Sequence, residues 1–213
     1  VVANMTLVDA GGEDGPVWRA IAARGLFEHA KSAGHLYQAH LRHLLSQRLG
    51  VEWGQVTNGY ADIAGVPQKV IDAFSKRRTE IAEVLAESGN SSARAAQIAT
   101  LESRKPKEYN VDPDTLFDTW RTEAKGLGFG AKQVNACLHR SQPANVTTVE
   151  IRAAFDALAG PAGLTERAST FRRSDVVEAL ASRLGASCTA SEIETHADAF
   201  LTGAAVTVVD RAA

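Results

Sequence analysis

The dipeptide Asn58-Gly59 is the feature that most constrains the fold of this chain. It stands between two short alternating runs in the stretch "VEWGQVTNGYADIAG". A type I′ turn needs two residues that tolerate positive φ, and Asn-Gly meets that need better than almost any other pair. We therefore predict a tight β-hairpin here.

A second hairpin is predicted at the start of the sequence. Two apolar runs, residues 1–8 and 17–21, flank the loop "DAGGEDGP". Glycine, proline and acidic residues are typical of turns, and the flanking runs are typical of strands. We expect the two runs to pair antiparallel.

Most of the remaining sequence predicts helices. Apolar residues recur every three or four positions from Leu26 to Leu49, which indicates an amphipathic helix with Tyr37, Leu41 and Leu44 on its apolar face and Gly50 as its cap. Further helices are predicted at residues 67–87, 91–101, 113–127 and 132–139. The fold class is therefore α+β.

The C-terminal segment has strong helix-start signals. Thr147 with Glu150, and Thr189 with Glu192, form capping boxes. The expected order is a helix, an extended piece at 169–171, a helix ending near 184, a helix to 201 and a closing strand at 204–209, which is the order of a small winged-helix-like module. The polar stretch around Pro143 predicts a division into residues 1–142 and 147–213.

Composition limits the function classes. The chain has 213 residues, 45% hydrophobic and 23% charged, which is typical of globular proteins. Its net charge of −2 excludes a bulk basic field, so nucleic-acid binding would rest on a local patch. No apolar stretch is long enough to span a bilayer. Cys137 and Cys188 match no metal spacing, and we expect two buried thiols in a reducing cytoplasm.

The histidines do not form a convincing metal site. His40 and His43 are three residues apart, and we expect a surface pair on the helix face away from Tyr37, because a metal would need a third ligand. The other four are expected to be structural or solvated: His29, His35, His139 and His196. "KGLGFGAK" at 125–132 follows a helix rather than a strand, so it predicts a helix stop and not a phosphate loop.

Basic residues form the best candidate site. The predicted DNA-binding residues are Lys76, Arg77, Arg78, Arg104, Lys105 and Lys107. Such clusters are either a solvated face or phosphate contacts lining a groove for single-stranded DNA. Trp120, Tyr109 and Phe129 lie among them and could stack on bases, although core packing is the other interpretation of Trp120.

Two alternatives remain open at this point. Arg172 and Arg173 begin a predicted helix and could meet a duplex backbone, which would make the chain a non-enzymatic helical DNA-binding or interaction module. The net charge of −2 also leaves open that the chain binds no nucleic acid.

The order of several segments resembles a known family. "VVANMT" is followed by an acidic glycine turn with Trp18, then by "AGHLYQAHLRHLLSQRLGVEW", "GVPQKVIDAFSKRRTEIAEVL" and "AAQIATLESRKPK". This series resembles the second half of the TrwC/MobF-type conjugative relaxase domain. Beyond Thr147, "TERASTFRRSDVVEAL" and "IETHADAFLT" resemble the segment that joins such a relaxase to its helicase portion.

The resemblance implies a DNA-nicking parent protein. In that family a tyrosine attacks a phosphodiester at the transfer origin, and a divalent metal held by three histidines polarises the phosphate. The matching His-x-His would directly precede Val1 and the tyrosines would lie further upstream, so no catalytic or metal role is carried to any residue here.

The resemblance also implies partners and a location. It predicts a relaxase fragment that keeps scaffold and single-stranded DNA-holding parts, in the cytoplasm. Its partners would be single-stranded DNA at a transfer origin and the rest of a relaxase–helicase polypeptide. No cofactor is expected in this chain, and a divalent metal is expected in the intact parent.

Overall fold

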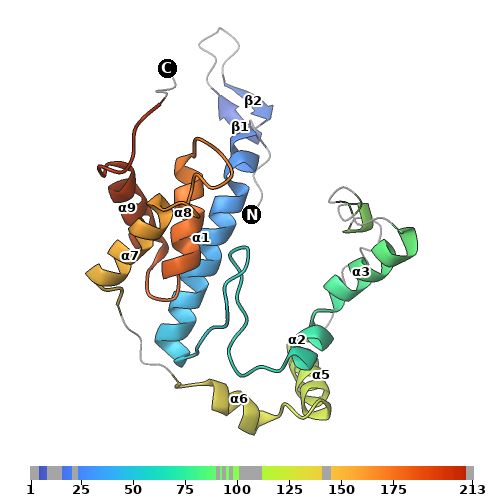
Figure 1. Cartoon of the computed structure of the whole chain (residues 1–213). Helices are drawn as coiled ribbons and strands as arrows, with labels where there is room; N and C mark the ends of the chain where they lie inside the picture. Colours follow the sequence, from blue (N-terminus) through green and yellow to red (C-terminus); the bar gives the residue numbers. More distant parts are fainter. Residues whose placement is uncertain are drawn as a thin grey trace. The chain divides into compact units, whose positions relative to one another are not determined.

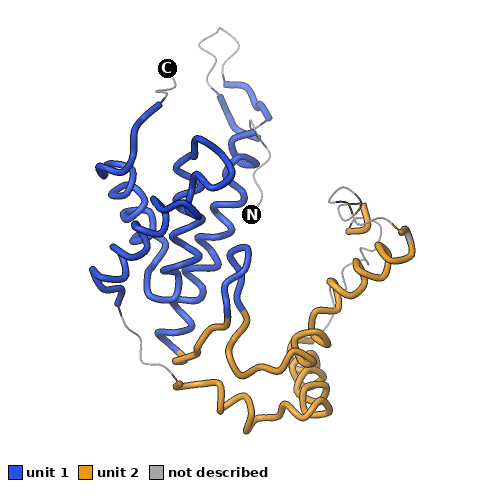
Figure 2. Tube along the Cα trace, in the orientation of Figure 1, with its two compact units in different colours: residues 1–48, 55–61, 143–213 blue, residues 49–54, 62–142 orange. Residues whose placement is uncertain are grey.

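The protein forms two compact units in a computed structural model (Figure 2). The structure describes residues 5–8, 16–20, 24–89, 92, 95, 98–100, 112–140 and 145–209. Unit 1 comprises residues 1–48, 55–61 and 143–213, and unit 2 comprises residues 49–54 and 62–142. Each unit has its own buried apolar cluster.

The first hairpin is confirmed in unit 1. Strand β1 (Met5–Val8) pairs antiparallel with β2 (Val17–Ala20), so that Met5 faces Ala20 and Val8 faces Val17. All eight residues are exposed, and Trp18 keeps 62% of its surface accessible. A two-stranded ribbon buries little by itself.

The long helix is confirmed, but its buried face is not the predicted one. Helix α1 (Arg24–Leu49) buries a mainly polar stripe, and Tyr37 is 65% exposed. The reason is the close approach of α8: a Cβ on Gly185 would lie 2.7 Å from the Cβ of Ala39. Small residues let the two backbones come together. The buried residues of α1 are Ser32, His35, Ala39, Arg42, His43 and Ser46.

Three C-terminal helices complete the core of unit 1 beside α1 (Figure 1). They are α7 (Thr148–Ala159), α8 (Arg173–Leu184) and α9 (Ala190–Leu201). Both predicted capping boxes are present. The buried core consists of Ala39, Ala154, Leu158, Val176, Val177, Leu180, Ala181, Leu184, Cys188, Ile193, Ala197 and Phe200.

The strands of the predicted winged module are wrong, although its helices are confirmed. Residues 169–171 and 204–209 form no ladder within the described part of the chain. Phe171 packs on Phe200 instead, with ring centroids 6.5 Å apart. Val208 and Val209 are 63% and 79% exposed, and no described strand pairs with them. A strand needs a partner that the apolar pattern alone cannot supply.

The Asn58-Gly59 turn is confirmed. Asn58 has φ 51° and Gly59 has φ 83°, and the amides of Thr57 and Tyr60 donate to each other's carbonyls at 2.8 and 3.0 Å. The buried Arg42 guanidinium donates to the Gly59 carbonyl at 2.6 Å and to that of Ala181 at 2.9 Å. Arg42 therefore ties the turn and α8 to α1.

Unit 2 consists of short helices around a small cluster. They are α2 (Gln68–Phe74), α3 (Lys76–Ser88), α5 (Pro113–Gly126) and α6 (Ala131–Cys137). The single helix predicted over 67–87 is wrong, because Ser75 breaks it: its hydroxyl donates to the Ile71 carbonyl at 2.7 Å. The helix predicted over 91–101 lies largely outside the described residues.

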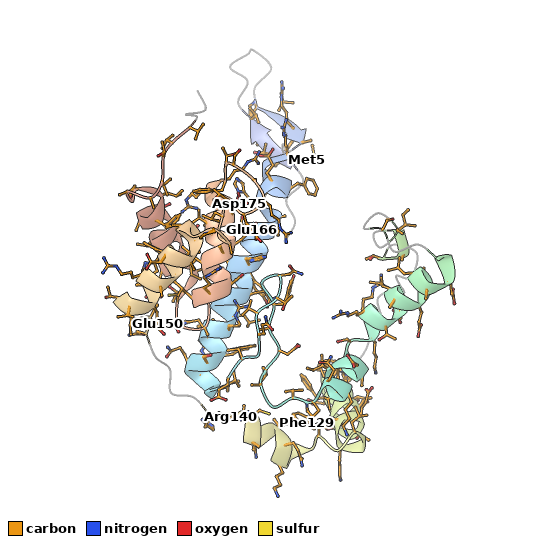
Figure 3. The ribbon with its side chains drawn as sticks, in the orientation of Figure 1. Met5, Phe129, Arg140, Glu150, Glu166 and Asp175 are labelled. Atoms are coloured by element: carbon orange, nitrogen blue, oxygen red, sulfur yellow. The ribbon has the colours of Figure 1, made fainter. Side chains whose placement is uncertain are left out.

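The buried cluster of unit 2 is much smaller than that of unit 1. It contains Val70, Phe129 and Cys137, with Ile63, Val66 and Leu127 packed against it. Arg140 follows α6 (Figure 3); its amide donates to the Gly50 carbonyl at 2.8 Å and its guanidinium to the Ala64 carbonyl at 3.1 Å. These bonds join the end of α6 to Gly50 and Ala64 within unit 2.

Candidate nucleic-acid interface

The predicted cations on α3 have different surroundings. Lys76 pairs with Glu123 at 2.9 Å, and Arg77 lies 3.4 Å from Glu80 and also donates to the Thr100 carbonyl. Arg78 is exposed and forms no ion pair with any residue that the structure describes. Exposed pairs of this kind contribute about 0–1 kcal/mol, so DNA phosphates can compete for these side chains. Arg104, Lys105 and Lys107 lie outside the described residues.

An open apolar groove lies on the same unit. We call it the aromatic groove; its volume is about 300 Å³. Phe74, Phe117 and Trp120 are 39%, 48% and 42% exposed, so these rings are only partly covered by protein. Trp120 thus lies on a groove wall rather than in a core. The lining residues are Val70, Phe74, Phe117, Trp120, Arg121, Ala124, Phe129 and Val134.

The sequence explains how α5 presents this wall. The Asp112 side chain accepts from the Thr115 amide at 3.1 Å and Pro113 occupies the first turn, which fixes the start of the helix. Hydrogen bonds from Thr115 hold the pKa of Asp112 below its usual value. Phe117, Trp120 and Ala124 then fall on one face, because i, i+3 and i+7 share a helix face.

The glycine-rich stretch after α5 is a helix stop, as predicted. Gly128 has φ 77°, and the Phe129 amide donates to the Ala124 carbonyl at 2.9 Å. This turn places Phe129, labelled in Figure 3, so that it belongs both to the groove lining and to the small core of unit 2. The amides of Leu127, Gly128 and Phe129 donate to carbonyls at the end of α5, so these three are not available to a phosphate.

Three lysines belong to the helices that line the groove. Lys69 is on α2, Lys125 is on α5 and Lys132 is on α6, the same helices that supply the lining. None of the three forms an ion pair within the described ranges. Two of the three acids of α5 form ion pairs, Asp118 with Arg121 at 2.9 Å and Glu123 with Lys76, and the third, Asp114, lies in the first turn of the helix.

The histidines do not build a metal centre. No group of three or more His, Cys, Asp or Glu residues in the described part of the chain could hold an ion. The predicted surface pair is wrong for His43, which is only 9% exposed because α1 turns this face to the core. His40 is half-buried, and its Nδ1 accepts from the Ala190 amide at 3.4 Å. The metal that the relaxase resemblance implies therefore does not fit these residues.

Both cysteines are buried free thiols, as predicted. Burial raises the pKa of Cys188 to about 11, and the charges of Glu192 and Glu150 act in the same direction. A thiol with so high a pKa is almost wholly protonated at neutral pH and is a poor nucleophile.

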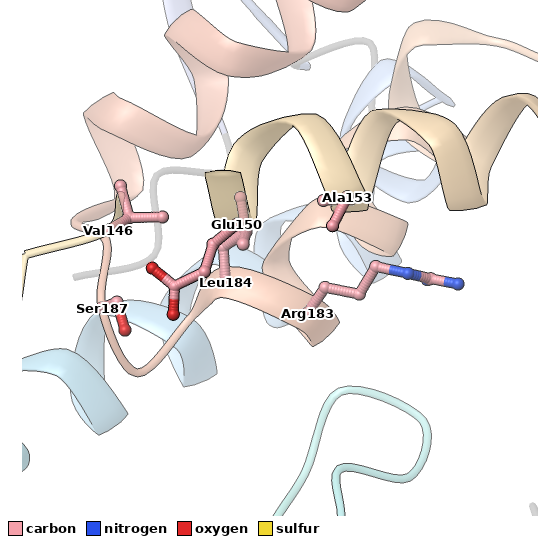
Figure 4. A pocket seen from close by; sticks show the side chains of 7 residues that line it. Val146, Glu150, Ala153, Arg183, Leu184 and Ser187 are labelled. Carbon is pink, nitrogen blue, oxygen red and sulfur yellow. The ribbon is translucent and has the colours of Figure 1, made fainter. Parts of the chain in front are cut away.

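The pocket between α7 and α8 does not bring an acid and a base together. Its volume is about 310 Å³. Figure 4 shows the Arg183 guanidinium directed away from the Glu150 carboxylate. That carboxylate accepts from the Thr147 amide and hydroxyl at 2.8 and 2.7 Å, and these bonds lower the pKa of Glu150. The Glu150 carboxylate thus serves as part of the cap of α7.

Of the two arginines considered for contact with duplex DNA, Arg173 is already held by a carboxylate. Arg173 donates to both carboxylate oxygens of Asp198, at 2.7 and 3.1 Å, and this hydrogen bonding raises the pKa of Arg173. The guanidinium therefore joins α8 to α9. Only Arg172 of the two remains without such a partner in the described structure.

Comparison with known proteins identifies the family. A family model described as TrwC relaxase matches residues 1–127. The chain belongs to the TrwC relaxase family. The described elements, one antiparallel hairpin followed by helices, give the chain an α+β fold.

Solved TrwC relaxase structures match part of the chain. They include a metal-free complex with oriT DNA, a complex with a 27-mer DNA comprising the recognition hairpin and the cleavage site, and a copper-bound complex with oriT DNA. Each is 33% identical with a TM-score of 0.47 and covers 59% of this chain. The chain spans 42–44% of those relaxases. Among curated proteins, none matches.

No described helix has the length and apolar character needed to cross a bilayer. Of the aromatic groove, sequence reasoning named Trp120 and Phe129 but not Phe74, Phe117 or the groove itself. The available signal was the i, i+3, i+7 spacing of Phe117, Trp120 and Ala124 with Arg121 beside them.

Proposed function

We propose that this chain is the rear part of a conjugative relaxase and that it provides scaffold and holds single-stranded DNA at a plasmid transfer origin. The family match over residues 1–127 carries the proposal. The matched relaxases have oriT DNA bound in their structures, which makes DNA the natural ligand class.

The hairpin of unit 1 supports the scaffold role. Both strands expose large apolar side chains, with Leu7 51% and Trp18 62% accessible. Unpaired strand edges and uncovered apolar faces are suited to receive further strands. We propose that the rest of a relaxase–helicase polypeptide is this partner, that residues 1–142 are the relaxase-like part, and that 147–213 lead toward the helicase, in the cytoplasm.

No catalytic step is assigned to residues of this chain. Its described residues lack a three-ligand metal set. One matched relaxase is copper-bound, and in an intact relaxase such an ion would polarise the scissile phosphate. The nicking chemistry would then use metal ligands and a nucleophile from other parts of the polypeptide.

The DNA-holding role is assigned to Lys76, Arg77, Arg78, Arg104, Lys105 and Lys107 as sequence-independent phosphate contacts. Single-stranded DNA loses affinity with log[salt] at a slope of about −0.7 per neutralised phosphate. Removing two contacts should flatten that slope by roughly 1.4.

The test is fluorescence anisotropy with labelled single-stranded and duplex DNA over a salt series. We expect a single-strand preference, and a lower affinity with a flatter salt slope in the variant Arg104→Glu/Lys105→Glu. The matched control is Arg24→Glu/Lys31→Glu, which reverses two exposed charges of unit 1, 91% and 74% accessible. This control should bind like the wild type.

Three results would contradict the proposal. Unchanged affinity and slope in the Arg104/Lys105 variant would remove the phosphate contacts. A duplex preference that Arg172→Glu abolishes would favour the helical DNA-binding module. Absence of binding to either DNA at low salt would mean that the chain does not hold nucleic acid.

A further inference from the structure

The aromatic groove of unit 2 has a wall that the small core of that unit does not require. Val70 and Phe129 are buried in the core, but Phe74, Phe117, Trp120 and Val134 stay 39–48% exposed. All but one of the eight lining residues are apolar. Exposed apolar surface gathered in one concave place is a mark of a binding site.

The shape of the wall favours a flat ligand. Phe117 and Trp120 meet edge to face, with ring centroids 5.6 Å apart and planes at 74°. This contact restricts rotation of the indole, while 42% of the Trp120 surface remains accessible. A partly exposed ring held in this way is a platform for stacking, and every nucleobase has a π face.

The unpaired lysines on the lining helices favour a ligand with an anionic backbone. Lys69, Lys125 and Lys132 are on the lining helices and form no ion pair in the part of the chain described. The Lys69 Nζ lies 4.0 Å from the position of a Cβ on Gly128, beside the turn that carries Phe129. An apolar floor with unpaired cations on its helices suits a base joined to phosphates better than a wholly apolar segment.

We infer that the aromatic groove holds one unstacked base of single-stranded DNA, with Trp120 as the stacking platform and Lys69, Lys125 and Lys132 near the flanking phosphates. This inference rests on the proposed DNA-holding function, and it adds a base-contacting site to the phosphate contacts of the α3 and 104–107 cations. It involves no covalent step.

The first experiment compares matched tryptophan variants of the whole chain. Labelled oligothymidylate of about 12 nucleotides is titrated by anisotropy. Trp120→Ala should weaken binding roughly 5- to 140-fold, because stacking of one base contributes about 1–3 kcal/mol. Trp120→Phe should recover most of the affinity. Trp18→Ala removes an equally prominent exposed indole, 62% accessible, and should have no effect.

Salt dependence separates the groove from the phosphate contacts. Trp120→Ala should leave the salt slope unchanged, because a stacked base releases no counterions. The lysine variant Lys125→Ala/Lys132→Ala should flatten the slope. If Trp120→Ala binds like the wild type while the wild type still binds DNA, the groove inference is wrong and the proposed function stands. If the wild type does not bind, both are wrong.

A second readout does not depend on affinity. In the background Trp18→Phe/Trp53→Phe, Trp120 is the single tryptophan of the chain. Oligothymidylate should quench its fluorescence, and an abasic oligonucleotide of equal length should bind with little quenching. Equal quenching by both would overturn the inference. Binding of an apolar dye to the groove that DNA does not displace would also overturn the inference, because a base in the groove would exclude the dye.

Discussion

The two units of the molecule differ in how they use apolar side chains. Unit 1 buries twelve residues in one cluster that joins α1 to α7, α8 and α9. Among the described residues of unit 2 the buried cluster contains three, and a row of aromatic side chains stays open in the groove. A large closed core makes a stable scaffold, whereas a small core beside open rings can adjust to a ligand. This difference leads us to expect a mainly structural role for unit 1 and a ligand-binding role for unit 2.

The largest expected effect comes from Arg42, which is 2% exposed in unit 1. Arg42→Ala should cost about 3–5 kcal/mol, because two charge-assisted hydrogen bonds are lost and a cavity is left. Arg42→Met keeps the packing of the side chain and isolates the hydrogen-bond loss. Chemical unfolding followed by circular dichroism measures both. A loss below about 1 kcal/mol in Arg42→Ala would show that the turn and α8 are not joined through this residue.

A matched pair of valines tests the comparison directly. Val176 in unit 1 is 0% exposed and Val70 in unit 2 is 5% exposed. Val176→Ala should cost on the order of 2–3 kcal/mol, and Val70→Ala roughly 1 kcal/mol, because a loosely packed site can collapse around the missing methyl groups. Hydrogen exchange assigns each loss to its unit. Equal losses would mean that unit 2 is as firmly packed as unit 1.

Gly59 tests whether the hairpin turn is part of the scaffold. Its φ is 83°, and a Cβ there would lie 2.9 Å from ring carbons of His35. Gly59→Ala should cost roughly 1–2 kcal/mol, from the left-handed backbone and the displaced ring. Asn58→Gly, which keeps the positive φ without a new contact, is the control. A neutral Gly59→Ala would place the turn outside the cooperative part of unit 1.

The smallest effects come from the helix caps. Thr189→Ala removes the α9 cap of unit 1 and should cost about 1 kcal/mol in unfolding at pH 7. Asp112→Ala removes the cap of α5, and its loss should be confined to hydrogen exchange in unit 2. Global unfolding after Asp112→Ala would show that the two units unfold together.

The caps also predict the direction of a pH dependence. Hydrogen bonds from Thr189 lower the pKa of Glu192 in the folded protein. The resulting stabilisation is present above the unfolded-state pKa of about 4.3 and is lost as the pH falls through the lowered folded pKa. Glu192→Gln should therefore be less stable than the wild type at pH 7, and the difference should shrink in acid. A pH-independent difference would exclude linkage through this carboxylate.

Much of the local structure was predictable because a few adjacent residues specify it. Asn58-Gly59 specified its turn and the two Thr–Glu boxes specified helix starts. Asp112-Pro113 likewise specified the start of α5. The candidate site was less predictable. Trp120 and Phe129 were predictable as stacking candidates. Phe74, Phe117 and Val134 join them only because α2, α5 and α6 come together, and no local sequence signal predicts that.

The sequence by itself determined the family, the α+β order of elements, the turn and the caps, since all of these depend on short-range chemistry or on an ordered series of motifs. Only the tertiary structure decided which face of α1 is buried. The small Ala39 lets α8 approach, and the Arg42 guanidinium donates a hydrogen bond to a carbonyl of α8. The tertiary structure also decided that 169–171 and 204–209 form no strands in the described chain, because a strand forms when a partner is present to accept its hydrogen bonds.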